Sequence, residues 1–409
     1  MQAGGVRVLR RLLGGALIAV ALAVAAPAAG AATREVLYVG NNWDGTIDVV
    51  DPRAFKPLDR LNAIPDRDQR MSELLLDPIR LVYFLGIRQL VGEGHDQYVD
   101  DMFSSHDGRM LYVSRPSFAD VVAIDLGNGK IVWRTRVDGY RTDHMAISPD
   151  GTRLVVSAST AKVVDVIDTS TGNIVGRFPS GDQPHENNFS RDGKLIYHAS
   201  IGMVFSPLPE PEFSATKGER YFEVVDASTL RVLKRIDMGQ KLAEFGRPGM
   251  SSAVRPMAFS PDERYVYFQV SYLHGFVEYD LQQDRVLRVA DLPLSDKGRN
   301  TPRAQYVLNS AHHGIQMNPE GTKLCVAGTM DDYAAIVSRA TFASTITPIG
   351  VRPYWATNST DGKYCFISVA GEDTVSVMSY ATEHQVARIP VGYHPQRMRM
   401  GEIRPEFLR

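Results

Sequence analysis

The sequence predicts an all-β fold, a seven-bladed β-propeller built from four-stranded blades. Three observations support this prediction. A unit of about 42 residues recurs along the chain, as is typical of a propeller blade. Each copy carries a turn signal, usually Asp-Gly, at the same offset. The last copy stops after one strand, and the strands that it lacks stand at the beginning of the chain.

The composition fits a folded domain with many turns, and it excludes several classes of protein. The 409 residues include 34 Gly and 23 Pro, spread along the chain, which indicates many short strands. With 45 Lys+Arg against 47 Asp+Glu, the chain lacks the basic surplus of a nucleic-acid-binding protein. A content of only 2 Cys rules out a Cys-rich zinc or iron–sulfur site.

Residues 1–31 are predicted to be a secretory signal peptide. Basic residues precede an apolar run over 12–26, and Ala29-Gly30-Ala31 has the small residues of a cleavage site. The apolar run is shorter than the roughly 20 residues of a membrane span; an uncleaved anchor is the alternative. We therefore expect a secreted or periplasmic protein that consists of a single propeller over 32–409 and has no membrane span after cleavage.

The copy over 144–181 shows the repeat most clearly. An apolar strand leads to the turn Pro149-Asp150-Gly151, a second strand covers 152–157, and a third covers 163–168. The turn Thr171-Gly172 and a fourth strand follow. Asp and Gly accept the backbone angles that tight hairpin turns need, so the pattern indicates four antiparallel strands.

The ring is expected to close between the two ends of the chain. The seventh copy begins at Val391 and ends with the chain, so it supplies one strand. The segments 36–40, 46–51 and 58–64 would supply the other three strands of this blade. Such a closure leaves no open sheet edge around the ring.

Three short units mark the repeat: Ser148-Pro149-Asp150-Gly151, Val164-Asp165-Val166-Ile167-Asp168 and Pro179-Ser180-Gly181-Asp182. They resemble the YVTN-type propeller repeat, a family that includes secreted YncE-like proteins. The resemblance covers nearly all of the mature chain and implies the propeller fold. It implies little about function, because the family includes binding proteins, scaffolds and propeller domains of redox enzymes.

Four insertions lengthen the connections between strands: 65–99, 201–220, 240–254 and 293–312. In a four-stranded blade, the loop between the second and third strands and the link to the next blade emerge on one face. All four insertions fall in such connections, so we expect one loop-rich face around the channel. Residues 71–90 are apolar at near-helical spacing and predict a helical lid that is broken at Asp77-Pro78. A packing cap over the closing blade is the alternative.

One residue per blade is expected to open on this face beside the central channel, at a fixed position before the turn. These residues are Asp100, Asp143, His185, Arg255, His313, Tyr354 and Gln396. Asp101, His144, Glu186, Trp355 and Arg397 follow them in sequence. Deeper positions are largely apolar, so polar groups gather at the mouth of the channel, a pattern typical of a ligand pocket.

The mouth contains the side chains of a metal site. The candidate ligands are His144, His185 and His313, with His312 and His394 as further candidates and Glu186, Asp100 and Asp143 as carboxylates beside them. Imidazole and carboxylate are common ligands of one divalent ion such as zinc, manganese or iron. A hydrated polar mouth without a metal is the alternative. If the protein is an enzyme, Glu186 or His185 is the expected general base, and Arg255 binds the substrate.

The same mouth contains the side chains of an organic ligand site. The candidates are Asp100, Asp143, Arg255, Tyr354, Trp355, Gln396 and Arg397. Arg255 and Arg397 suit a carboxylate or phosphate, unless they form internal ion pairs. Tyr354 and Trp355 suit a sugar or an aromatic ring, unless they pack the mouth.

Three functions are compatible with these patterns. The first is an exported protein, expected to be monomeric, that binds a small molecule or an extracytoplasmic protein at the loop-rich face. The second is a metal-dependent lyase or lactonase. The third, an accessory subunit of a periplasmic oxidoreductase, rests on the resemblance alone. The sequence has no Gly-rich phosphate loop, Gly-x-Ser-x-Gly elbow or Cys-x-x-Cys-His motif.

The two cysteines, Cys325 and Cys365, fall on the second strands of neighbouring blades. A disulfide is conceivable in an oxidising compartment. Facing sheets are about 10 Å apart, however, which is wide for a disulfide, so two buried thiols are the favoured expectation.

Overall fold

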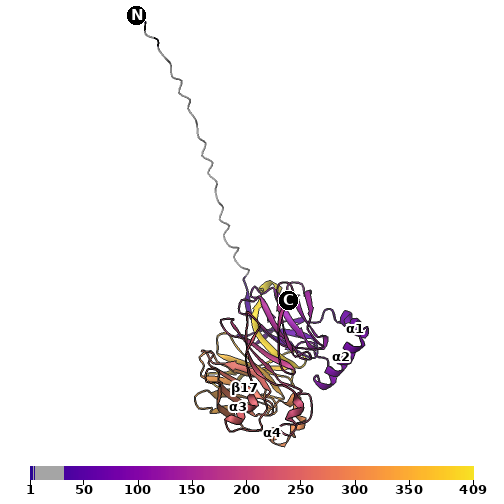
Figure 1. The fold of residues 1–409 in the computed structure, drawn as a ribbon, viewed down its shortest axis with the longest axis vertical. Coiled ribbons are helices and arrows are strands. Elements are labelled where there is room, and N and C mark those ends of the chain that lie inside the picture. The colour runs from indigo at the N-terminus through magenta and orange to yellow at the C-terminus, as the bar shows by residue number, and fades with distance from the viewer. Residues whose placement is uncertain (3, 5–31) are drawn as a thin grey trace. The chain divides into compact units, whose positions relative to one another are not determined.

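Seven four-stranded antiparallel sheets form the blades of a β-propeller over residues 32–409 (Figure 1). The computed structural model describes residues 1, 2, 4 and 32–409. The predicted fold class is confirmed, including the number of blades and of strands in each blade. The predicted signal peptide falls on residues of which nearly all lie outside the described ones.

Six blades follow the chain order, each with its innermost strand first. Blade 2 contains β4 (Met102–Ser104), β5 (Met110–Arg115), β6 (Asp120–Asp125) and β7 (Lys130–Arg136). Blade 3 contains β8 (Thr142–Ile147), β9 (Arg153–Ala158), β10 (Val163–Asp168) and β11 (Ile174–Pro179). Blade 4 contains β12 (Pro184–Phe189), β13 (Leu195–Ser200), β14 (Phe222–Asp226) and β15 (Val232–Ile236). Blade 5 contains β16 (Val254–Phe259), β17 (Tyr265–Val270), β18 (Gly275–Asp280) and β19 (Arg285–Asp291). Blade 6 contains β20 (Ile315–Met317), β21 (Lys323–Gly328), β22 (Tyr333–Ser338) and β23 (Ser344–Pro348). Blade 7 contains β24 (Pro353–Asn358), β25 (Tyr364–Val369), β26 (Thr374–Ser379) and β27 (Gln385–Pro390).

Blade 1 joins the two ends of the chain, as predicted. It contains β28 (Pro395–Ile403), β1 (Arg34–Asn41), β2 (Thr46–Asp51) and β3 (Lys56–Asn62), in that order from the channel outward. β28 and β1 pair in antiparallel register from Arg34 opposite Ile403 to Asn41 opposite Pro395. The C-terminal strand thus fixes the N-terminal blade, and the ring has no open edge.

Burial within a blade follows the pattern of the sequence. The outermost strand β7 alternates between exposed and half-buried residues, whereas the second strand of the next blade, β9, is buried almost throughout. Period-two alternation is typical of a strand with one face in solvent, and continuous apolar runs are typical of strands covered on both faces. The apolar core therefore lies between the blades, over their inner strands.

The helices occur in the insertions. They are α1 (Arg67–Leu75), α2 (Pro78–Leu90), α3 (Met238–Glu244) and α4 (Asp296–Asn300), and short 3₁₀ turns cover Pro116–Phe118, Ser214–Lys217, Arg303–Gln305, Val307–Asn309 and Pro405–Phe407. The helical segment over 71–90 is present with its predicted break, because Asp77 caps α2 by accepting a hydrogen bond from the Arg80 amide at 3.1 Å. Among the described residues, no helix has the length and apolar character that a membrane span needs.

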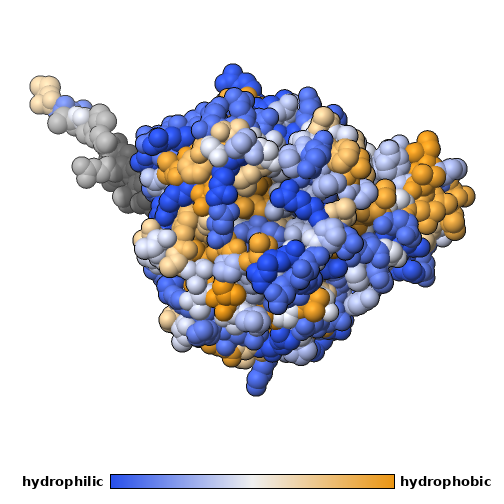
Figure 2. All heavy atoms as spheres, turned by 90° about the horizontal axis from the view of Figure 1, so that it is seen from below, coloured by the Kyte–Doolittle hydropathy of each residue, from blue (hydrophilic) through white to orange (hydrophobic). Residues whose placement is uncertain are grey.

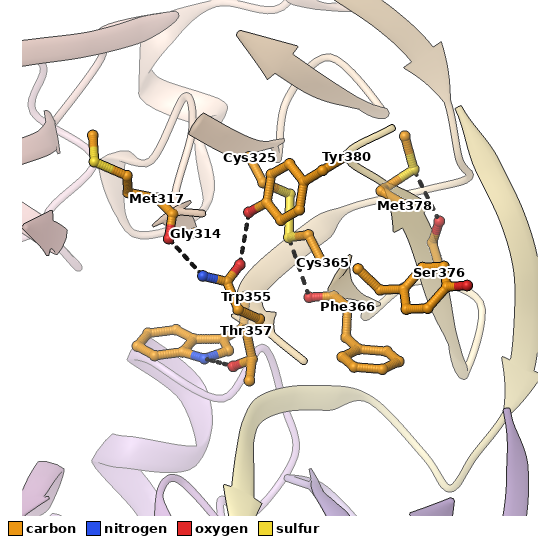
Figure 3. The surroundings of a disulfide bond; sticks show 12 residues. Gly314, Met317, Cys325, Trp355, Thr357, Cys365, Phe366, Ser376, Met378 and Tyr380 are labelled. Atoms are coloured by element: carbon orange, nitrogen blue, oxygen red, sulfur yellow. Dashed lines mark hydrogen bonds between the residues drawn. A yellow bond between two sulfur atoms is a disulfide. The ribbon is translucent and has the colours of Figure 1, made fainter. Parts of the chain in front are cut away.

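The two cysteines form a disulfide, so the expectation of two buried thiols is wrong. Cys325 on β21 and Cys365 on β25 lie with their Cα atoms 6.6 Å apart, inside the core between blades 6 and 7 (Figure 3). The spacing of two flat facing sheets does not apply here, because neighbouring blades converge toward the channel. At this separation a disulfide forms without backbone movement.

Candidate functional site

The residues predicted to share the mouth of the channel come together there. Each stands at or just before the start of an innermost strand, where seven strands converge on one axis. Six of the seven column residues line a single cavity: Asp100, Asp143, His185, Arg255, Tyr354 and Gln396. The seventh, His313, stacks on Tyr354 with a centroid distance of 4.0 Å. The repeat register therefore places chemistry from all seven blades at one point.

The cavity is small and covered. Its volume is about 30 Å³, roughly the room of one water molecule. Val91, Phe205 and Leu308, from three different insertions, line it. Ala253, from the fourth insertion, packs in one apolar cluster with Leu308. Residues of all four insertions therefore contribute to the cover of the mouth.

Three of the arginines around the mouth form internal ion pairs. Arg397 lies 3.3 Å from Asp100, and Arg141 lies 2.5 Å from Asp143. Below them, Arg399 binds both carboxylate oxygens of Asp101, at 2.7 and 2.9 Å. The ion-pair alternative raised for Arg397 is thus the arrangement in the structure.

Arg255 differs from the other arginines of the mouth. Its side chain is 1 % exposed and donates hydrogen bonds to the Ser271 hydroxyl, at 3.0 Å, and to the Leu308 carbonyl. Among the described residues no carboxylate forms an ion pair with it, and its Nε has no hydrogen-bond partner. Burial lowers the pKa of Arg255 to about 10, so the guanidinium stays charged at neutral pH. The mouth therefore holds one buried positive charge without a counter-charge.

The three predicted histidines lie close together and are neutral. The rings of His144 and His185 are 3.9 Å apart between centroids, and His313 lies 6.4 and 6.0 Å from them. Burial, with the positive field of Arg397, holds the pKa of each histidine well below its usual value. His144 Nδ1 lies 2.5 Å from Glu186. His144 Nε2 and His185 Nδ1 have no partner among the described residues.

A divalent ion would find part of the predicted ligand set in one place. Asp143, His144 and His185 offer ligand atoms that all lie within 4.8 Å of one another. The neutral imidazoles and a carboxylate suit zinc, manganese or iron, and His144 Nε2 is 3.7 Å from Asp143 Oδ1. His313, whose ring lies 6.4 and 6.0 Å from those of His144 and His185, is not part of this group.

Two carboxyl groups of the mouth are poised to exchange protons near neutral pH. Burial raises the pKa of Glu186 to about 7 and that of Asp100 to about 7, although nearby arginines act in the opposite direction. Glu186 accepts a further hydrogen bond from the Asn188 amide at 2.9 Å. Groups with such pKa values can serve as a general acid or base.

Some candidates lie outside the cavity. Trp355 is buried beneath the mouth, where its Nε1 donates to Thr357 at 3.0 Å, so the packing alternative describes it. His394 stacks on Trp43 with centroids 3.5 Å apart, away from the three histidines. His312 lies 2.9 Å from Asp331 through its Nε2 and not at the mouth.

The cavity also contains residues that the repeat does not indicate. Arg141, Gln97 and Gln183 line it, although none of them occupies the repeat column. Arg141 stands two residues before Asp143, in the link between blades. In the sequence, Arg141 is marked only by its positive charge in the link between two blades.

A second histidine–carboxylate cluster lies off the axis. Asp331 lies in the turn between β21 and β22. One of its carboxylate oxygens is hydrogen-bonded to both His274 Nδ1, at 2.5 Å, and His312 Nε2, at 2.9 Å. Its other oxygen accepts the Ser295 amide at 2.8 Å, and Tyr306 bonds His274 Nε2 at 2.8 Å. The cluster ties the insertion over 293–312 to blades 5 and 6.

A larger cavity of about 410 Å³ adjoins this second cluster. His274, Tyr272 and Arg303 line it, together with residues of three insertions. Ser271, which accepts the hydrogen bond of Arg255, is also in its wall. This pocket therefore lies beside the mouth and not on the axis.

Comparison with known proteins supports the fold alone. No family model and no curated protein matches the chain. Among solved structures, the chain is similar to hydrazine synthase of Kuenenia stuttgartiensis, with a TM-score of 0.59 and 18 % identity over 84 % of this chain and 92 % of that one. The resemblance to the YVTN-type repeat family stays a prediction, because no family model matches the chain.

Proposed function

We propose that this protein is an exported propeller that binds a small anionic ligand, a carboxylate or a phosphate, at the mouth of its channel. The observation that carries this proposal is Arg255, a buried guanidinium without a counter-charge. Taking such a charge out of water is costly unless a partner compensates it. The disulfide between Cys325 and Cys365 supports export, because disulfides persist in oxidising compartments.

The groups around Arg255 suit an anion. Arg397 lies on the same cavity wall, and its Nε has no hydrogen-bond partner among the described residues. The Arg255 guanidinium offers a planar fork that binds carboxylate and phosphate oxygens through paired hydrogen bonds, and Arg397, which is paired with Asp100, adds positive charge beside it. Gln396 and Tyr354 add an amide and a phenol to the wall. A cavity of about 30 Å³ admits such a ligand only after Phe205 and Leu308 move aside.

Isothermal titration calorimetry tests the proposal with inorganic phosphate, acetate and succinate as probes. We expect at least one of them to bind the mature protein, and Arg255→Gln to weaken that binding at least tenfold, since a charged hydrogen bond is worth about 1.5–3 kcal/mol. Arg264→Gln is the matched control, because Arg264 pairs with Asp280 away from the mouth. Failure of all three probes, or equal binding by Arg255→Gln, would contradict the proposal.

A metal-dependent hydrolase or lyase is the second candidate, and the convergence of Asp143, His144 and His185 favours it. When bound, a divalent ion would polarise a substrate oxygen or lower the pKa of a water. Glu186, hydrogen-bonded to His144 and with a pKa of about 7, would take or return a proton beside these residues.

Elemental analysis of protein purified without a His tag separates the two candidates. The metal candidate predicts near-stoichiometric metal that is lost in His185→Ala and kept in His274→Ala, a substitution in the second cluster. Metal-free protein that binds no added zinc or manganese would leave anion binding as the function of the mouth.

A further inference from the structure

The helical hairpin of α1 and α2 carries an exposed apolar face. Its side chains are Leu75, Leu76, Ile79, Val82, Leu85 and Leu90, with exposed fractions between 46 % and 86 %. Figure 2 shows apolar side chains gathered on the part of the molecule that projects at the right, the side on which Figure 1 places both helices. Contiguous apolar surface of this kind marks an interaction site.

The opposite side of the hairpin is firmly attached to the propeller. Leu74 and Phe84 pack with Tyr98 and Phe118 in one apolar cluster. Arg70, itself buried, donates to the Phe118 carbonyl at 2.9 Å. The helices therefore use one side for the fold, and the exposed face is left for another purpose.

This face does not cover the channel mouth. No residue of α1 or α2 lines the small cavity, and of the insertion over 65–99 only Val91 and Gln97 do. Tyr83, at the rim of the face, stacks on Tyr140 with centroids 4.0 Å apart, in the link between blades 2 and 3. The hairpin thus projects from the side of the ring, and the lid role expected for residues 71–90 does not describe its exposed residues.

The charged residues of the hairpin are paired with one another or with the propeller. Glu73 contacts Arg134, Asp77 contacts Arg80, and Arg88 contacts Asp96 through two hydrogen bonds. No lysine occurs between Lys56 and Lys130. The face therefore offers no lysine to anionic lipid headgroups, which interfacial helices commonly attract with basic residues.

An uncharged apolar face is complementary to its own copy, because a two-fold axis brings the same patch against itself without like-charge repulsion. The six side chains expose on the order of 700 Å², close to the roughly 800 Å² that each partner buries in a stable interface. We propose that two copies of this chain associate through the hairpins, with α2 of one packed across α2 of the other. A dimer departs from the monomer expected from the sequence.

Sedimentation velocity of the mature protein over a wide concentration range tests this proposal. We expect a dimer, and we expect Val82→Asp to weaken dimerisation about a hundred-fold, since the two-fold axis buries the new carboxylate twice in apolar surroundings. Val175→Asp is the matched control: Val175 is 59 % exposed on β11, against 68 % for Val82. Near-ultraviolet circular dichroism would verify that both variants stay folded.

Two results would overturn the proposal. One is a monomer at every concentration, and the other is a dimer that Val82→Asp leaves intact. In the first case, flotation with phosphatidylglycerol vesicles that is lost in Val82→Asp would assign the face to a membrane surface instead. Both tests are independent of ligand binding at the channel mouth.

Discussion

The molecule contains two buried clusters of histidine and carboxylate, and they differ in how completely their polar atoms are paired. In the off-axis cluster, Asp331 accepts from His274, His312 and the Ser295 amide, and His312 Nδ1 is the one ring nitrogen without a partner among the described residues. At the channel mouth, by contrast, His144 Nε2, His185 Nδ1, Asp100 Oδ2 and the Nε atoms of Arg255 and Arg397 have no partner among the described residues. Buried polar atoms are normally paired, so the mouth differs from the off-axis cluster in keeping several donors and acceptors open to a further hydrogen bond.

The carboxyl groups of the two clusters also differ in their pKa values, in line with this difference in pairing. Burial would raise the pKa of Asp331, but the hydrogen bonds from His274 and His312 hold it well below its usual range. Burial raises the pKa of Glu186 and of Asp100 to about 7, because the partners of these two groups compensate burial less. A side chain that is fully paired is fixed in one charge state, whereas the carboxyl groups of the mouth can change theirs.

The largest expected effect is on stability, from Asp331→Ala. This substitution leaves His274, His312 and the Ser295 amide without their acceptor, and we expect a loss of about 4 kcal/mol in the free energy of unfolding. Urea denaturation measures it. Asp100→Asn, in the mouth, should cost less than about 1 kcal/mol at pH 5, because the pKa of about 7 already leaves Asp100 protonated and uncharged beside Arg397 at that pH. Equal losses in the two variants would show that the clusters do not differ in this way.

The sequence was sufficient for the fold and for the position of the mouth. Turns such as Pro149-Asp150-Gly151 and the strands around them are local patterns, so the seven blades and the closure of the ring could be counted. The repeat register also decides which residue of each innermost strand faces the channel. His185, Arg255 and Tyr354 could therefore be placed together before their contacts were known.

The sequence did not predict which side chains contact one another. His312 and His313 are neighbours, yet one bonds Asp331 in the off-axis cluster and the other stacks on Tyr354 at the mouth. Partners that come from separate insertions and blades have no fixed spacing in the chain. The same holds for the disulfide, since the approach of Cys325 to Cys365 depends on the tilt of neighbouring blades.

The second largest effect is a pH dependence caused by Glu186. Since burial raises its pKa from 4.5 to about 7, the folded protein holds a proton between these values that the unfolded chain has released. The contribution of this group to stability therefore falls as the pH rises from about 4.5 to 7. Glu186→Gln keeps the uncharged form, so we expect it to match the wild type near pH 5 and to exceed its free energy of unfolding by roughly 3 kcal/mol near pH 8.

Urea titrations at several pH values measure this difference. Glu320→Gln, in an exposed turn, is the control and should follow the wild type throughout. The neutral histidines of the mouth act in the opposite direction, because they lose stability as the pH falls below 6.5, but they are common to all three proteins. A constant offset between Glu186→Gln and the wild type would mean that Glu186 is ionised in the folded protein at all these pH values.

The smallest effect concerns Arg255 and bears most directly on function. Arg255→Met removes the uncompensated charge and fills a similar volume, but it gives up the hydrogen bonds to Ser271 and Leu308. We expect the free energy of unfolding to change by less than about 1 kcal/mol, on the stabilising side. Arg399→Met is the matched variant and should cost about 3 kcal/mol, because it leaves the Asp101 carboxylate unpaired. Thermal denaturation with and without phosphate completes the test, since only the proteins that keep Arg255 should gain stability from a bound anion.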